Sequence, residues 1–164
     1  MLLRHAKAET PAALADEMRP LALLGRTQCA RLARLLVDGG VVPDVVLVST
    51  AVRTRQTWDL VRSGLGAVAP EVRLEDVLYG AAPREVVGLL RRVDPEARTV
   101  LVVGHEPTMS AVAAVLAGDG EAAHLAQVRT GLPTATAAIL DVPGAWSELD
   151  ANVALLRDLV RPPR

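Results

Sequence analysis

Two of the three histidines in the chain stand directly after short apolar runs. His5 follows the run Met1–Leu3 after one arginine, and His105 follows the run Val100–Val103 after one glycine. Runs of this kind are typical of buried strands in an open α/β sheet, and such sheets bind their ligands just outside the carboxyl ends of the strands. If both runs lie in one sheet, the two imidazoles meet at one edge of it, where chemistry is expected.

A third polar segment, Ser49–Thr57, follows the apolar run Val45–Val48. Within it, Arg53 stands at the start of a predicted helix, where free N–H groups and the helix dipole favour an anion. Arg53 and Arg4 both carry a planar, permanent charge that suits phosphate oxygens. Pro107, a residue suited to a first helical turn, marks a second helix start beside the second histidine. Together these residue types predict a small electropositive pocket for a phosphoryl group.

Helical patterns separate the predicted strands. Apolar residues recur at i, i+3, i+4 and i+7 in a helix that follows Gly25 and that Gly39-Gly40 ends. Three further helices are predicted at Val52–Arg62, Pro83–Val93 and Pro107–Leu116. Strands that alternate with helices indicate a mostly parallel sheet covered on both faces, which is a three-layer α/β sandwich.

The pattern changes near the end of the chain. Thr134–Asp141 is predicted as a strand, Trp146–Leu149 as an extended piece and Leu155–Val160 as a last strand. These segments would add antiparallel strands to the sheet, and a terminal helix over residues 151–160 is the alternative.

Composition limits the class of protein. The chain has 164 residues, of which 51% are hydrophobic, and this suits a single domain over residues 1–164. The net charge of −1 argues against a nucleic-acid-binding protein with a general basic surface. No apolar run reaches the roughly 18 residues that span a bilayer, no leader pattern precedes the first run, and Cys29 is the only cysteine. We therefore expect a cytoplasmic protein without a membrane partner, with Cys29 buried on a helix.

Several motifs together resemble those of the histidine phosphatase superfamily, which includes the phosphoglycerate mutases. They are Arg4-His5-Ala6, the pattern Ser-x-x-x-Arg-x-x-Gln-Thr at Ser49–Thr57, and Gly104-His105. The chain length and the set Arg19-Pro20-Leu21, Gly25 and Gln28 resemble more narrowly the short SixA-like phosphohistidine phosphatases. The resemblance runs in order from Met1 to about Pro107 and continues more weakly to the end. The first run is short for this family, which leaves open whether the natural start lies upstream of Met1.

The resemblance implies a phosphoglycerate mutase-like fold and a reaction without a metal or other cofactor. His5 would attack phosphorus and form a transient phosphohistidine that water hydrolyses, and it must be neutral to do so. Arg4, Arg53 and His105 would hold the oxygens of the transferring phosphoryl group. The sequence offers no carboxylate cluster or His/Cys spacing that is typical of a metal site.

The resemblance places a general acid three residues before a Tyr-Gly pair, where this chain has Asp76, with Glu75 one residue earlier. Arg19 either reaches the phosphate from its loop or pairs with Asp16 or Glu17. The carboxylate of Glu106 could orient His105 or the approach of substrate. It is expected instead to point to solvent, because a further negative charge in a phosphate site is unfavourable.

The remaining aromatic side chains and the third histidine are expected to have no part in the chemistry. Trp58, Trp146 and Tyr79 are the largest candidates for the core, and His124 is expected on the surface.

The segment between Tyr79 and Thr99 has room for one helix and not for a long lid. An open rim suits a phosphohistidine on a protein, for example on a histidine phosphotransfer domain. Two alternatives remain: a phosphatase for a small phosphomonoester, and a non-catalytic module that binds phosphorylated proteins.

Overall fold

Seven strands form one sheet in the computed structural model, which describes residues 1–10 and 15–163. Their order across the sheet is β3-β2-β4-β1-β6-β7-β5. The strands are Leu2–Arg4 (β1), Val45–Ser49 (β2), Glu71–Glu75 (β3), Val100–Gly104 (β4), Ala117–Gly120 (β5), Ala137–Asp141 (β6) and Ala154–Val160 (β7). The first four strands in this order pair in parallel, whereas β6 is antiparallel to β1 and to β7. The predicted sheet, mostly parallel with antiparallel strands added late, is confirmed.

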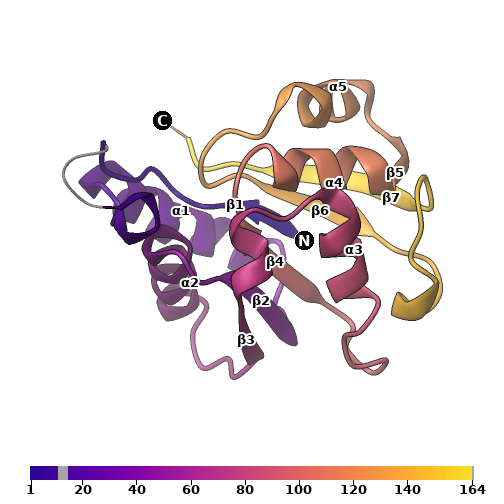
Figure 1. Cartoon of the computed structure of the whole chain (residues 1–164), viewed down its shortest axis with the longest axis horizontal. Helices are drawn as coiled ribbons and strands as arrows, with labels where there is room; N and C mark the ends of the chain where they lie inside the picture. The colour runs from indigo at the N-terminus through magenta and orange to yellow at the C-terminus, as the bar shows by residue number, and fades with distance from the viewer. Residues whose placement is uncertain (11–14, 164) are drawn as a thin grey trace.

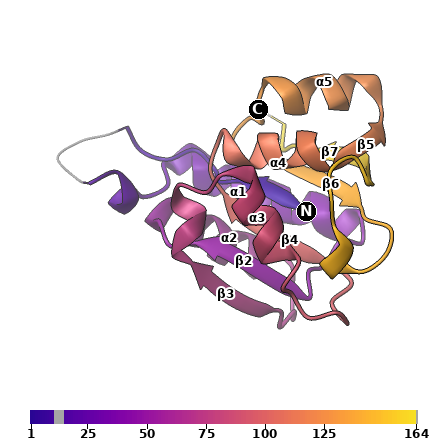
Figure 2. The ribbon, with the colours of Figure 1, turned by 45° about the vertical axis from the view of Figure 1, so that its right-hand side comes forward.

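Helices cover both faces of the sheet, as the sequence predicts. The helices are Leu23–Asp38 (α1), Val52–Gly64 (α2), Pro83–Leu90 (α3), Thr108–Leu116 (α4) and Ala122–Thr130 (α5), with short 3₁₀ helices at Asp16–Met18 (η1), Asp76–Tyr79 (η2) and Trp146–Glu148 (η3). Figure 1 shows α1 and α2 towards one side of the molecule and α3 and α4 towards the other. In Figure 2, α5 lies beyond α4, against which it packs. The architecture is a three-layer α/β sandwich.

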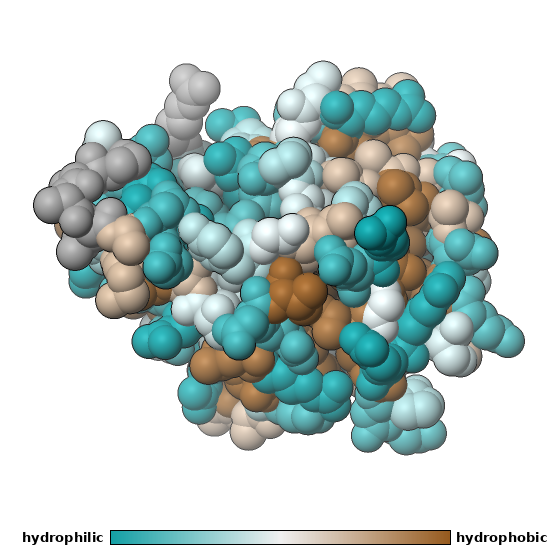
Figure 3. Space-filling view, in the orientation of Figure 1, coloured by the Kyte–Doolittle hydropathy of each residue, from teal (hydrophilic) through white to brown (hydrophobic). Residues whose placement is uncertain are grey.

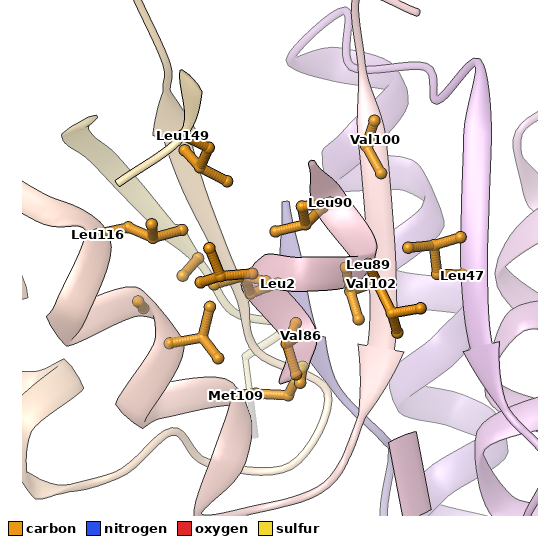
Figure 4. Packing of buried hydrophobic residues seen from close by; sticks show 14 of the residues in the cluster. Leu2, Leu47, Val86, Leu89, Leu90, Val100, Val102, Met109, Leu116 and Leu149 are labelled. Carbon is orange, nitrogen blue, oxygen red and sulfur yellow. The ribbon is translucent and has the colours of Figure 1, made fainter. Parts of the chain in front are cut away.

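Two hydrophobic clusters fill the space between these layers. Along β1, Leu2 belongs to the cluster under α3 and α4, and Leu3 belongs to the cluster under α1 and α2. β4 alternates in the same way, with Val102 on one face and Val103 on the other. Because successive side chains of a strand point to opposite faces, a strand covered on both sides is apolar throughout. Figure 4 shows the first cluster, with Leu2, Val102 and Met109 packed together.

The predicted helices are confirmed, with shifted ends. α1 begins two residues before Gly25, and α2 continues to Gly64, beyond its predicted end at Arg62. α3 ends at Leu90, so Val93 lies past the helix but is still buried in the core. Cys29 is fully buried on α1, as expected, and burial raises the pKa of its thiol to about 12.

The end of the chain differs from the prediction at residues 146–148, which form a 3₁₀ helix and are not extended. The predicted last strand is confirmed as β7, so the alternative of a terminal helix over 151–160 is wrong. The sequence analysis placed no strand at β3 and missed β5 and α5. β5 has the sequence Ala-Gly-Asp-Gly, which has little strand propensity and is held by pairing with β7, and α5 buries only Val128. No helix among the described residues is long and apolar enough to cross a membrane.

Candidate active site

The register between β1 and β4 brings the two histidines together. Arg4 pairs with Gly104 in the parallel ladder, so the next residue of each strand leaves the sheet at the same edge. The backbone N–H of His5 donates to the carbonyl of Gly104 at 3.0 Å. The two imidazole ring centres lie 5.3 Å apart. The predicted meeting of the two rings is confirmed.

The segment after β2 brings Arg53 to the same edge. Arg53 lies in the first turn of α2 and is only 6% exposed. Later residues of the motif fasten α2 to two loops: Thr57 Oγ1 accepts from the N–H of Ala6 at 3.0 Å, and Gln56 Oε1 accepts from the N–H of Leu21 at 2.8 Å. The Gln-Thr pair of the motif therefore positions the loop that carries the first histidine.

Hydrogen bonds assign the proton on each ring. Nδ1 of His5 lies 2.7 Å from the carbonyl oxygen of Ala6, which can only accept, so Nδ1 carries the proton. Nε2 of His5 then has a free electron pair, which accepts a hydrogen bond from Arg53 Nε at 3.3 Å. In His105, Nδ1 accepts from Arg53 Nη2 at 3.3 Å, so the protonated Nε2 donates to Ser49 Oγ at 2.8 Å. Both rings are neutral in this arrangement.

The pKa values agree with neutral rings. Burial lowers the pKa of His5 to about 4. The hydrogen bond to Ala6 opposes this shift, and the positive charge of Arg53 adds to it. Burial and then the charge of Arg53 lower the pKa of His105 to about 3. At neutral pH the site therefore offers an unprotonated Nε2 next to a guanidinium, which suits attack on an anionic phosphoryl group.

Asp16 joins the site, and the sequence analysis considered it only as a partner of Arg19. Its Oδ2 accepts from Arg53 Nη2 at 2.9 Å and from the hydroxyl of Tyr79 at 2.7 Å, and its Oδ1 accepts from Arg19 Nη1 at 2.7 Å. Its carbonyl oxygen accepts from Arg53 Nη1 at 2.6 Å. The hydrogen bond from Arg19, followed by the one from Tyr79, holds the pKa of this carboxyl well below its usual range. A carboxylate thus occupies donors that would otherwise be available to a phosphoryl oxygen.

Arg19 pairs with Asp16, which was one of its two expected positions. Its Nε and Nη2 also donate to the carbonyl oxygen of Glu9, at 3.0 and 2.6 Å. Tyr79 is not a core residue, which corrects the prediction: it is 40% exposed and its ring lies edge-on to His105, 5.4 Å between centres. It is exposed because η2 lies at the rim and not under a helix.

The prediction for Glu106 is wrong. Its side chain does not point to solvent: Oε1 accepts from the N–H of Leu132 at 2.8 Å, and Oε2 is buried. Arg4 Nη1 donates to the carbonyl oxygen of the same residue, Leu132, at 2.6 Å. The loop before β6 thus contacts both Arg4 and Glu106, and its backbone N–H gives the carboxylate a partner that sequence spacing cannot reveal.

The two candidate acids take no part in this network. Asp76 begins η2 and is exposed, and Glu75 ends β3. Neither side chain hydrogen-bonds or ion-pairs with another described residue, so the structure does not join them to the histidines. His124 lies on α5, where its Nε2 is 3.9 Å from a carboxylate oxygen of Glu121. Its side chain is 24% exposed, so it is only partly on the surface.

Four cavities of about 220 to 520 Å³ among the described residues lie away from the site, because Arg4, His5, Arg53 and His105 line none of these four. The largest lies at the other end of the strands, beside Met1 and Val100. Residues 1–10 and 15–163 contain no group of three or more His, Cys, Asp or Glu side chains that could hold a metal ion.

Comparisons with known proteins place these features in a family. The model described as "Histidine phosphatase superfamily (branch 1)" matches residues 1–84. An uncharacterized protein of Mycobacterium tuberculosis is 40% identical over 156 residues, which cover 94% of this chain and 96% of that protein.

Solved structures are similar over nearly the whole chain. A structure assigned to the phosphohistidine phosphatase SixA of Nakamurella multipartitia has a TM-score of 0.80 and 33% identity, covering 99% of this chain and 95% of that one. Another, assigned to SixA of Agrobacterium tumefaciens, has a TM-score of 0.81 and 30% identity, covering 98% and 95%.

Proposed function

Because the chain belongs to branch 1 of the histidine phosphatase superfamily, we propose that it removes phosphate from phosphohistidine on a protein, through a transient phosphohistidine on His5. The chain is a hydrolase of the histidine phosphatase type with the α/β fold of that family. The observation that carries the proposal is the assigned proton on His5: Nδ1–H donates to Ala6, which leaves the electron pair of Nε2 at the rim beside Arg53.

In the first step, Nε2 of His5 forms a bond to phosphorus while the bond from phosphorus to the substrate nitrogen breaks. Arg53 gives up its hydrogen bonds to the two rings and donates to a phosphoryl oxygen, together with Arg4. His105 donates to the phosphoryl group by turning its single N–H away from Ser49. In the second step, water attacks phosphorus and the bond from phosphorus to Nε2 of His5 breaks. Inorganic phosphate leaves, His5 regains its electron pair, and a proton of the water returns to the carboxyl group that protonated the leaving group in the first step. We assign no metal or other cofactor to either step.

The leaving imidazole of a phosphohistidine needs a proton, and Asp76 is the candidate donor, with Glu75 as the alternative. A P–N bond is labile, so acid catalysis matters less here than for an alkyl phosphate. We expect Asp76→Asn to slow hydrolysis of a phosphomonoester with a poor leaving group by about tenfold or more, with little effect on phosphohistidine. If Asp76→Asn and Glu75→Gln both leave the phosphomonoester rate unchanged, neither residue is the acid.

A protein substrate is supported by the side chains that surround the site. Exposed apolar side chains lie on the elements that carry the site: Met18 on η1 is 54% exposed, and Val77 and Tyr79 on η2 are each 40% exposed. Figure 3 shows apolar residues gathered below the middle of one face. Exposed apolar residues beside a charged pocket suit a partner protein that presents the phosphate.

The proposal is tested by exposing the protein briefly to a small phosphoryl donor, quenching at alkaline pH and locating the phosphate by mass spectrometry. We expect an acid-labile adduct on His5 that is absent from His5→Ala and retained in the matched control His124→Ala. In parallel, release of phosphate from a histidine-phosphorylated phosphotransfer protein is expected to exceed release from p-nitrophenyl phosphate.

The same experiments distinguish the two alternative functions from the proposed one. Faster turnover of small esters than of the phosphorylated protein would favour a phosphatase for a small phosphomonoester. Binding of the phosphorylated protein with neither an adduct nor phosphate release would favour a non-catalytic binding module. An adduct that persists in His5→Ala would contradict the assignment of His5 as nucleophile.

A further inference from the structure

The backbone of Leu132 links an acidic and a basic side chain of the site through two consecutive peptide groups. Its N–H donates to Glu106 Oε1 at 2.8 Å, and its carbonyl oxygen accepts from Arg4 Nη1 at 2.6 Å. Glu106 directly follows His105, and Arg4 directly precedes His5. The loop before β6 is therefore fastened by a residue next to each histidine.

The backbone around this peptide is built to accept the carboxylate. Gly131 has φ +115°, a conformation that side chains rarely adopt, and a Cβ atom there would lie 3.1 Å from Glu106 Oε1. The side chain of Leu132 is 1% exposed in the core, and Gln127 Nε2 donates to the carbonyl of Gly131 at 2.7 Å. The peptide is thus fixed on several sides, and the Glu106 carboxylate is the partner of its N–H.

We propose that Glu106 is a positioning residue that orients the guanidinium of Arg4 towards the phosphoryl group, acting through the backbone of Leu132. The inference rests on the proposed function, in which Arg4 holds a phosphoryl oxygen. Glu106 holds the peptide group that joins Gly131 to Leu132, and the Leu132 carbonyl belongs to the next peptide group along the chain. The buried side chain of Leu132 and the proline that follows it restrict the two torsions between these groups. Holding the first group therefore also limits the direction of the carbonyl that accepts from Nη1 of Arg4. The remaining guanidinium donors then meet the phosphate in a set geometry, as a preorganised site requires.

The charge of Glu106 explains why the contact is built in this way. A carboxylate beside the phosphate would oppose binding if it faced the anion. Glu106 instead directs one oxygen at a backbone N–H and buries the other, and the Nε of Arg4 is also buried. Neither buried atom hydrogen-bonds with the residues that the structure describes. The carboxylate therefore acts on the arginine through the loop backbone and does not compete with it for the substrate.

A double-mutant cycle tests this inference. Glu106→Ala, Arg4→Ala and the double variant are compared for kcat/KM, and for orthovanadate binding measured by calorimetry. Glu106→Ala loses a hydrogen bond to a charged group, so we expect it to lower kcat/KM and to weaken orthovanadate binding, each by about tenfold or more. In the Arg4→Ala background, Glu106→Ala is expected to add less than about twofold, because the arginine through which it acts is gone.

Matched variants separate positioning from folding. Glu106→Gln keeps an oxygen that accepts from Leu132 and is expected to stay within about threefold of the wild type. In Glu106→Asp the shorter side chain cannot reach the N–H of Leu132. This variant replaces Glu106→Ala in the cycle if the alanine variant does not fold. Glu96→Ala, an exposed glutamate on the turn before β4, is the control.

The inference would be overturned if the effects of Glu106→Ala and Arg4→Ala on kcat/KM and on orthovanadate binding were fully additive. It would also be overturned if Glu106→Ala matched the wild type in both measurements. Non-additivity with His105→Ala in place of Arg4→Ala would show that Glu106 acts on its neighbour in sequence. If the wild type binds orthovanadate but turns over no substrate, the proposed function fails while the binding cycle still decides the role of Glu106. Absence of orthovanadate binding by the wild type would overturn both.

Discussion

At the scale of single residues, the site depends on which nitrogen of each imidazole carries a proton. The carbonyl of Ala6 holds the proton on Nδ1 of His5, and Arg53 can only donate to Nδ1 of His105. Burial and the Arg53 charge favour the neutral form of both rings. The same arginine is thus suited both to keep the nucleophile unprotonated and to receive the phosphoryl oxygens.

A first prediction concerns pH. The pKa of His5 is about 4 and that of His105 about 3, so we expect the NMR resonances of both rings to stay unchanged from pH 8 to pH 5. The unfolded chain binds protons near the ordinary histidine pKa of about 6.5, so the free energy of unfolding falls as pH drops from there towards 4. The variants His5→Ala and His105→Ala identify which NMR resonance belongs to which ring. A His5 resonance with a midpoint near 6.5 would contradict the prediction.

A second prediction concerns Asp16, whose carboxylate occupies donors of Arg53, Arg19 and Tyr79. Asp16 is largely exposed, and exposed ion pairs are worth about 1 kcal/mol or less. Asp16→Asn removes the competing charge, so inhibition by inorganic phosphate should tighten by about twofold to fivefold. Asp59→Asn, an exposed aspartate on α2, is the control. Weaker inhibition would mean that Asp16 mainly holds the arginines in place.

At the scale of elements, α1 packs directly on the segment that leaves β1. Gly25 lies against the backbone of Lys7, and a methyl group at Gly25 would overlap the Lys7 carbonyl oxygen. Gln28, one turn later, accepts from the N–H of Lys7 at 2.9 Å and donates to Thr134 Oγ1 at 3.2 Å. The glycine and the glutamine of the family-like motif therefore hold the loop that follows His5.

A matched pair of glycines tests this packing. Gly25→Ala is expected to destabilise the protein by about 1 to 3 kcal/mol, because the methyl group forces α1 away from Lys7. It should also lower turnover, since the loop after His5 shifts. Gly88→Ala lies in α3, where a Cβ atom meets nothing within 4 Å, and should raise stability by about 0.5 to 1 kcal/mol. Urea unfolding measures both, and equal stability of the two variants would refute the packing argument.

At the scale of the whole molecule, one sheet joins two cores. Trp58 is 3% exposed and belongs to the cluster with α1 and α2, whereas Trp146 packs against the cluster with α3 and α4. The central strands β1 and β4 contribute residues to both clusters. Loss of either core would therefore uncover one face of the strands that hold the histidines.

The two tryptophans test whether the chain unfolds as one domain. In Trp58→Phe, fluorescence reports only the core of Trp146, and in Trp146→Phe it reports only the core of Trp58. We expect the fluorescence transition in urea to coincide with the far-UV circular dichroism transition in each variant, as a two-state domain requires. A fluorescence transition that precedes the loss of secondary structure in either variant would indicate two separately unfolding parts.

The sequence by itself determined the strands β1, β2 and β4, the first four helices and the meeting of His5 with His105. These features follow from local periodicity and from the rule that parallel strands end at one edge. The tertiary structure alone decided the places of Asp16, Glu106 and Tyr79, and the pairing of β5. Those contacts join residues far apart in the chain or depend on loop backbone, as when Glu106 meets the N–H of Leu132, and no pattern of side-chain types records where a loop carries its N–H groups.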